Sequence, residues 1–143
     1  MVEGDTIRFG TWRFVAHSTP GHTPGCTTWS TTLHSHGRAL DAQFLCSTSV
    51  PGYTRLVNNA DYPSIAKDYA ATFSKLARLP CSTFFHEHPQ GFQLERKIQA
   101  LQDTPGVYPF TDPGGCRTTI AGDMAQFKRM LAKQTAAPVA PRD

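Results

Sequence analysis

The sequence predicts an α/β or α+β fold in which helices cover a sheet. Three observations support this fold class. The first third of the chain alternates apolar and polar residues as strands do, the second half carries helical periodicity, and one short β-like run lies between the helices. The 143 residues, 39% of them hydrophobic, suit one ordinary domain with a buried core.

The strands come first along the chain. Two runs rich in aromatic and β-branched residues flank Gly10, and a Thr- and Trp-rich run follows the first Pro-Gly turns. The polar segment His34–Arg38 is typical of a hairpin turn, so the chain returns after it as another strand. We therefore expect strands at residues 6–9, 12–17, 26–33 and 39–46.

Residues 47–59, which include Pro51-Gly52, predict an extended loop before the first helix. Asp61 is a suitable N-cap and Pro63 suits the first turn of that helix. Apolar residues recur at helical spacing up to Pro80, namely at Ile65, Tyr69, Phe73, Leu76 and Leu79.

The remaining elements are a short strand at 81–86, a weaker helix at 92–101 and a Pro- and Gly-rich loop at 104–115. A final helix is expected from Ile120, where Met124, Phe127 and Leu131 mark one apolar face. Residues 136–143 predict a flexible tail, which leaves residues 1–135 as the folded unit.

Composition excludes two classes of partner. The net charge of +3 comes from scattered Lys and Arg with no basic run, so we expect no nucleic-acid partner. No stretch approaches the roughly 20 apolar residues that cross a bilayer, so we expect no membrane partner. Met1 leads directly into polar residues, and we expect no signal peptide in this chain.

The four cysteines are compatible with either disulfides or buried thiols on their number alone. The cysteines are Cys26, Cys46, Cys81 and Cys116. None of the spacings between them is the two-residue gap of a zinc knuckle or a redox motif. Disulfides would imply an oxidising compartment. Reduced, buried thiols are the alternative.

The most informative segment is Ser18–Gly25, where His22 lies in a tight turn directly after a predicted strand. Pro20 fixes its own φ, and Gly21 and Gly25 permit backbone angles that other residues avoid. Such a turn can hold an imidazole rigidly towards a metal ion. An ordinary Pro-Gly turn with an exposed histidine is the alternative.

This turn resembles the third metal-binding motif of the metallo-β-lactamase superfamily. Further segments, in the same order along the chain, resemble subclass B3 metallo-β-lactamases in particular. These segments are residues 25–29, 46–53, 62–63, 68–69, 79–81, 88–89 and 109–116. The resemblance covers nearly the whole chain and implies the C-terminal half of an αββα sandwich, with a mixed sheet and helices packed on one face.

The resemblance implies a role for four residues. His22 and His88 match metal ligands, one for each of the two Zn²⁺ ions of a full-length enzyme. Ser47 and Ser49 match serines that lie beside the metals, one ordering a water molecule and the other donating to the carboxylate of the antibiotic. His86 and Glu87 could compete with His88 by chemistry, but the His88-Pro89 pair favours His88.

The resemblance also implies a disulfide between Cys81 and Cys116, which are separated by 35 residues. Cys26 and Cys46 lie on neighbouring predicted strands, and we expect a second bridge between them. Closing the 35-residue loop between Cys81 and Cys116 contributes about 4 kcal/mol to stability in the chain-entropy model.

The sequence lacks the His-x-His-x-Asp-His cluster that supplies the other ligands in this family. His34-Ser35-His36 begins like it, but Arg38 and Ala39 stand where the Asp-His pair should be, so both histidines are expected in an exposed turn. The resemblance implies that the nucleophile of a full-length enzyme is a hydroxide held by zinc, so no catalytic residue is expected in this chain. The chain is therefore expected to be inactive alone.

The implied function is zinc-dependent hydrolysis of β-lactam antibiotics, in the periplasm or outside the cell as in the parent family. The uncovered inner face of half a sandwich would invite self-association. Two alternatives stay open at this point. The chain could come from another hydrolase of this fold, acting on a lactone or thioester, or it could be a catalytically silent structural module.

Overall fold

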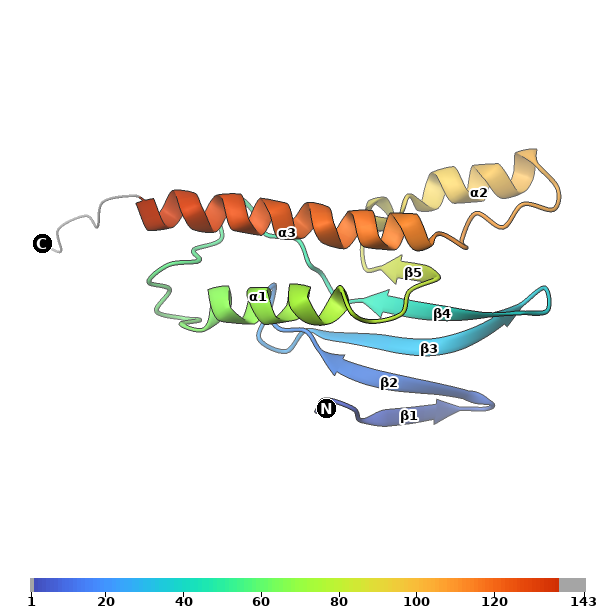
Figure 1. The fold of residues 1–143 in the computed structure, drawn as a ribbon, viewed down its shortest axis with the longest axis horizontal. Helices are drawn as coiled ribbons and strands as arrows, with labels where there is room; N and C mark the ends of the chain where they lie inside the picture. Colours follow the sequence, from blue (N-terminus) through green and yellow to red (C-terminus); the bar gives the residue numbers. More distant parts are fainter. Residues whose placement is uncertain (1, 137–143) are drawn as a thin grey trace, which may run out of the picture.

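The computed structural model describes residues 2–136 and has a five-stranded mixed sheet with helices packed against it (Figure 1). Strand order follows chain order, and every neighbouring pair is antiparallel except β4 and β5, which are parallel. The strands are β1 (Thr6–Phe9), β2 (Trp12–Ser18), β3 (Thr27–Ser35), β4 (Arg38–Leu45) and β5 (Thr83–His86). The helices are α1 (Ile65–Leu76), the 3₁₀ turn η1 (Pro89–Phe92), α2 (Leu94–Asp103) and α3 (Pro113–Ala136).

The predicted fold class and strands are confirmed, each strand to within one or two residues. The hairpin between β3 and β4 turns at His36 and Gly37, whose φ angles of 51° and 72° are both positive. That pair of angles is typical of the two-residue turn that matches the twist of a hairpin. His36 and His34 are exposed, as predicted, but His34 lies in β3 and not in the turn.

The first helix begins later than predicted, and Asp61 is not its N-cap. Ser64 precedes the first helical residue, Ile65. The side chain of Asn59 explains the difference, because its Oδ1 accepts hydrogen bonds from the backbone N–H groups of Asp61 and Tyr62. The chain therefore makes a side-chain-stabilised turn where the sequence predicts the helix start.

The last helix begins seven residues earlier than predicted, at Pro113 instead of Ile120. Asp112 Oδ1 accepts a hydrogen bond of 2.8 Å from the N–H of Gly115, as an N-cap side chain does. Pro113 then occupies the first helical position, where its missing N–H costs nothing. The helix runs to Ala136, and the rest of the predicted tail, residues 137–143, lies outside the described residues.

The two faces of the sheet differ. Strand register places Ala16, Trp29, Phe44 and Phe85 side by side on one face. Leu45 and Phe84 point to the opposite face, where they join the core with the apolar side chains of α1 and α3. In Figure 1, α1 and α3 run along the sheet.

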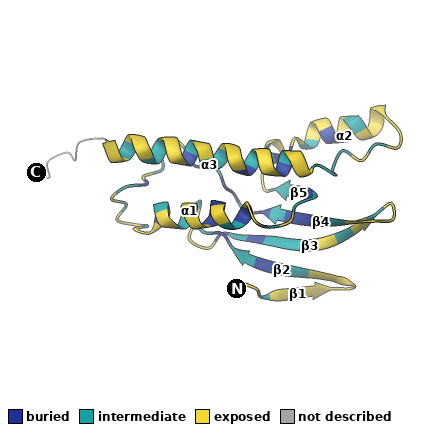
Figure 2. Ribbon diagram, in the orientation of Figure 1, coloured by how far each residue is buried: buried dark blue, intermediate teal, exposed yellow. Residues whose placement is uncertain are grey.

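We call the face that carries Trp29, Phe44 and Phe85 the open face. Phe44 packs between Phe14 and Phe85 on it, with ring centroids 5.9 and 4.9 Å apart. The β1–β2 hairpin is largely exposed (Figure 2). On this face it carries Phe9, which is 73% exposed, and Trp12. At the β5 edge of this face, Phe85 packs against Phe92 and Phe110. The part towards the β1–β2 hairpin is therefore an apolar surface that no element within residues 2–136 covers.

Candidate functional site

The predicted site residues all follow strands that end at the same edge of the sheet. Strands β2 and β4 both run antiparallel to β3, and β5 runs parallel to β4, so the carboxyl ends of β2, β4 and β5 meet (Figure 1). His22 follows β2, Ser47 and Ser49 follow β4, and His88 follows β5. The topology thus gathers segments from three parts of the sequence.

Side chains of α1 contact and position the turn that carries His22. Thr72 Oγ1 donates a hydrogen bond of 2.7 Å to the carbonyl of Pro20. Gly21 has a φ of +145° and lies so close to the ring of Tyr69 that an added Cβ would be 2.8 Å from it. Only glycine satisfies both the backbone angle and this approach.

The imidazole of His22 is oriented by the loop after β4. Its Nδ1 lies 3.0 Å from the carbonyl oxygen of Ser49 and 3.4 Å from the Ser49 hydroxyl. A carbonyl oxygen only accepts, so Nδ1 must carry the hydrogen. In the neutral ring, Nε2 then keeps its lone pair, and we find no hydrogen bond to Nε2 within residues 2–136.

This arrangement is the one that metal-binding histidines commonly show, with one ring nitrogen donating to a backbone carbonyl and the other free for the metal. The half-buried His22 therefore fits a zinc ligand on its own geometry. The residues described here fit only part of a site, because residues 2–136 hold no group of three His, Cys, Asp or Glu side chains that could bind a metal ion.

Ser47 and Ser49 form a hydroxyl pair, with 2.8 Å between the two Oγ atoms. Ser47 Oγ also accepts from the N–H of Ser49 at 3.3 Å. One hydrogen bond between two hydroxyls uses one of their two hydrogens. The other hydrogen has no further acceptor in the described part of the chain and can be donated to a ligand oxygen.

The loop of residues 46–59 is fixed by polar side chains of α3. Thr48 donates to Asp123, and Gln126 Nε2 donates to the carbonyl of Val50 at 2.9 Å. Gln134 accepts from the N–H of Leu56 at 2.7 Å. The sequence did not single out Asp123, Gln126 and Gln134, although they lie at steps of three and eight in the predicted last helix.

His88 lies apart from this cluster in its contacts. Its side chain is 66% exposed, and no hydrogen bond joins it to His22, Ser47 or Ser49 among residues 2–136. The neighbouring His86 ring is buried, and its Nδ1 accepts a hydrogen bond of 3.1 Å from the N–H of His88. That bond occupies the lone pair of His86 Nδ1, so in the neutral ring the hydrogen lies on Nε2 and neither nitrogen can bind a metal. This favours His88 over His86 as the candidate ligand.

Both predicted disulfides are present. Cys26–Cys46 joins the end of the His22 turn to the start of the serine loop, so the two segments that make the cluster are covalently tied. Cys81–Cys116 joins the segment before β5 to the first turn of α3. Within residues 2–136 no cysteine is free.

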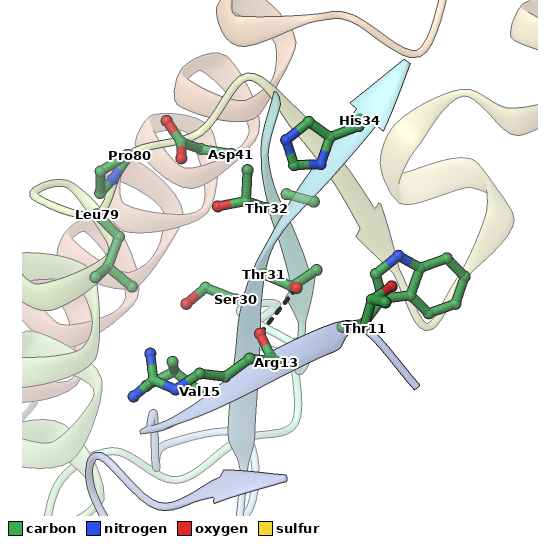
Figure 3. Close-up of a pocket in the computed structure, with 12 residues that line it drawn as sticks. Thr11, Arg13, Val15, Ser30, Thr31, Thr32, His34, Asp41, Leu79 and Pro80 are labelled. Atoms are coloured by element: carbon green, nitrogen blue, oxygen red, sulfur yellow. Dashed lines mark hydrogen bonds between the residues drawn. The ribbon is translucent and has the colours of Figure 1, made fainter. Parts of the chain in front are cut away.

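A separate groove of about 580 Å³ lies on the sheet between β2, β3 and the segment after α1 (Figure 3). Its polar lining includes Arg13, Ser30, Thr32, His34 and Asp41. None of the predicted site residues lines it. None of the helices within residues 2–136 is long and apolar enough to cross a membrane.

The comparison with known proteins gives a consistent result. No protein-family model matches the chain. Among solved structures, the native metallo-β-lactamase from Legionella gormanii is 36% identical with a TM-score of 0.90, covering 94% of this chain and 51% of that chain. A subclass B3 metallo-β-lactamase of Bradyrhizobium japonicum is 34% identical with a TM-score of 0.85, covering 95% of this chain and 51% of that chain.

A metallo-β-lactamase from Cronobacter sakazakii is similar at 29% identity, with a TM-score of 0.86 and coverage of 96% of this chain and 51% of that chain. The chain therefore spans about half the length of the solved structures that it matches.

Proposed function

We propose that this chain, which matches about half the length of subclass B3 metallo-β-lactamases in fold and sequence, is the C-terminal half of such an enzyme and supplies part of the active site of a zinc-dependent β-lactam hydrolase. The observation that carries the proposal is the His22 imidazole, whose Nδ1 is committed to the Ser49 carbonyl while Nε2 stays free. His88, at the same edge of the sheet, is the proposed ligand of the second zinc.

Zinc supplies Lewis-acid activation of a carbonyl group and an activated water. The chain's own contribution is to bind and orient. His22 would hold one metal, and the Ser47–Ser49 pair would donate its spare hydroxyl hydrogen to the substrate carboxylate, adding no charge that competes for the metal. The remaining ligands would come from a His-x-His-x-Asp-His cluster, which this sequence lacks.

The same proposal accounts for the open face. In a sandwich of two sheets, the apolar row of Phe14, Phe44 and Phe85 would be covered by the sheet of the other half. Alone, that surface would favour self-association of the chain. We further propose an oxidising location such as the periplasm, because two disulfides tie the structure together.

The proposal is tested by substitution in a full-length protein, made by joining this chain to the N-terminal half of the Legionella gormanii enzyme. His22→Ala should lower bound zinc and remove hydrolysis together. Ser49→Ala should leave zinc in place and raise KM for a carbapenem or cephalosporin about tenfold, because one hydrogen bond to a charged group is lost. Unchanged zinc content in the His22→Ala protein would contradict the proposed ligand role.

A further inference from the structure

One buried hydroxyl reaches the same backbone oxygen as His22. Tyr69 donates a hydrogen bond of 2.8 Å to the carbonyl of Ser49, and His22 Nδ1 lies 3.0 Å from that same oxygen. A carbonyl oxygen has two lone pairs, so it can accept both hydrogens at once. From the geometry we infer that Tyr69 is a positioning residue for His22.

Tyr69 is itself held firmly, as a positioning residue must be. It is 1% exposed, and its ring packs against the rings of Phe73 and Phe127, with centroids 6.0 and 5.5 Å away. Burial raises the pKa of the Tyr69 phenol well above its ordinary value, which keeps the hydroxyl protonated as a donor.

The same ring also supports the backbone next to His22. It lies against Gly21, at a position that leaves no room for a Cβ atom. Tyr69 therefore contacts both segments of the cluster, the turn at residues 20–22 through its ring and the serine loop through its hydroxyl. Tyr69 is therefore the side chain that contacts both the turn of the imidazole and the carbonyl that accepts its hydrogen bond.

The consequence concerns which tautomer His22 adopts. While the Ser49 carbonyl is fixed, it favours the ring with hydrogen on Nδ1 and the lone pair on Nε2. When the hydroxyl is removed, the carbonyl loses one of its two donors and the loop can turn it away. His22 should then populate the other tautomer, in which Nε2 carries hydrogen and cannot bind a metal.

The test is Tyr69→Phe, which removes the hydroxyl and keeps the ring stacking. The tautomer ratio of His22 is measured by ¹⁵N-detected NMR of the metal-free chain, at a pH where the ring is neutral. We expect the ratio to shift about fivefold towards the Nε2–H form, which corresponds to the loss of one ordinary hydrogen bond. Tyr108→Phe, at an exposed tyrosine whose ring contacts that of His36, is the matched control and should leave the tautomer ratio of His22 unchanged.

A purely structural role for Tyr69 would lower stability but leave the tautomer ratio unchanged, and that result would overturn the inference. If the variant does not fold, the unmodified chain decides instead. Its Tyr69 hydroxyl proton should exchange slowly and show a nuclear Overhauser effect to the Nδ1 proton of His22. Absence of both signals would equally overturn it.

The inference rests on the proposed role of His22 as a metal ligand, yet its test needs no metal. A correct tautomer shift with no zinc bound by any full-length form would leave the positioning role standing and remove the metal role. The two failures are therefore distinguishable.

Discussion

At the scale of single residues, the site depends on how little freedom the His22 turn has. The φ of Gly21 lies in a region that side-chain-bearing residues avoid, and the Tyr69 ring fills the space where a Cβ would project. The next residue is His22, so any displacement of Gly21 moves the imidazole relative to the Ser49 carbonyl.

Gly21→Ala should therefore destabilise the chain by about 2 kcal/mol or more, from backbone strain and overpacking together. Denaturant unfolding followed by Trp fluorescence measures the change. Gly25→Ala is the control, because a Cβ at Gly25 meets nothing within 4 Å and no positive φ is involved. Equal effects of the two substitutions would show that the contact with Tyr69 is unimportant.

The roles of His22, Ser47 and Ser49 stay predictions, but the structure brings these residues together, because Ser49 lies within hydrogen-bonding distance of both of the others. Their partner Tyr69 was assigned only to an apolar helix face, since spacing shows which side of a helix is buried but not where a hydroxyl ends. The acceptor is 20 residues away along the chain.

At the scale of elements, the start of α3 is stabilised by one carboxylate. Asp112 caps the helix through Gly115, and its Oδ2 lies 3.1 Å from Nζ of Lys97. Lys97 is 2% exposed and lies over the ring of Phe84 at 4.9 Å. Burial disfavours ionisation of Asp112, but the Gly115 N–H and the Lys97 ammonium outweigh it and hold the pKa of Asp112 below its ordinary 3.8.

This shift makes the pH dependence of stability predictable. A carboxyl group whose pKa is lower in the folded than in the unfolded state stabilises the fold above the unfolded pKa. That contribution is lost as pH falls through the folded pKa. Unfolding free energy should therefore decrease as the pH falls below about 4.

Asp112→Asn keeps the cap but removes the charge beside Lys97. We expect the free energy of unfolding at pH 7 to fall by about 2 kcal/mol. This is less than for a fully buried ion pair, because Asp112 is partly exposed. The variant's stability should also vary less with pH below 4 than that of the unmodified chain. Thermal unfolding from pH 2 to 7 checks both, and parallel pH profiles would contradict the assigned role.

Element boundaries show where sequence patterns mislead. The strands were predicted closely because alternation and turn residues are local signals. The start of α3 was missed because Pro113-Gly114-Gly115 resembles a loop, although Asp112-Pro113 is a good cap followed by a good first residue. The Asp112 side chain determines that residues 113–115 begin a helix. Composition alone does not distinguish such a cap from a turn.

At the scale of the whole molecule, the β1–β2 side of one sheet face has no covering layer within residues 2–136. Helices pack on the Leu45 and Phe84 side, while Phe9 and Trp12 on the open face are 73% and 48% exposed. Contiguous apolar surface of this kind is normally covered by another layer or another chain.

The isolated chain should therefore self-associate with rising concentration, as sedimentation velocity would show. Replacing Phe9 and Trp12 together by Ser should reduce the association, because both project from the open face. Replacing the exposed Tyr108, whose ring contacts that of His36, should not reduce the association. A chain that stays monomeric at high concentration, with a cooperative transition at high temperature, would count against this account of the open face.

The overall architecture could be anticipated only through resemblance. Periodicity predicted a sheet with helices, but it contains no information on which face of the sheet stays uncovered, since that depends on strand register and on a partner layer. Both disulfide pairings agreed with expectation, one from the resemblance and one from neighbouring strands.

The most direct test of the central claim is hydrolysis of a carbapenem or cephalosporin, with zinc content, for the purified chain alone and combined with an N-terminal half that carries the His-x-His-x-Asp-His cluster. We predict no turnover and little zinc for the chain alone, and turnover with two zinc ions per folded protein for the combination. A folded combination that binds no zinc and hydrolyses nothing would contradict the claim and favour a catalytically silent module.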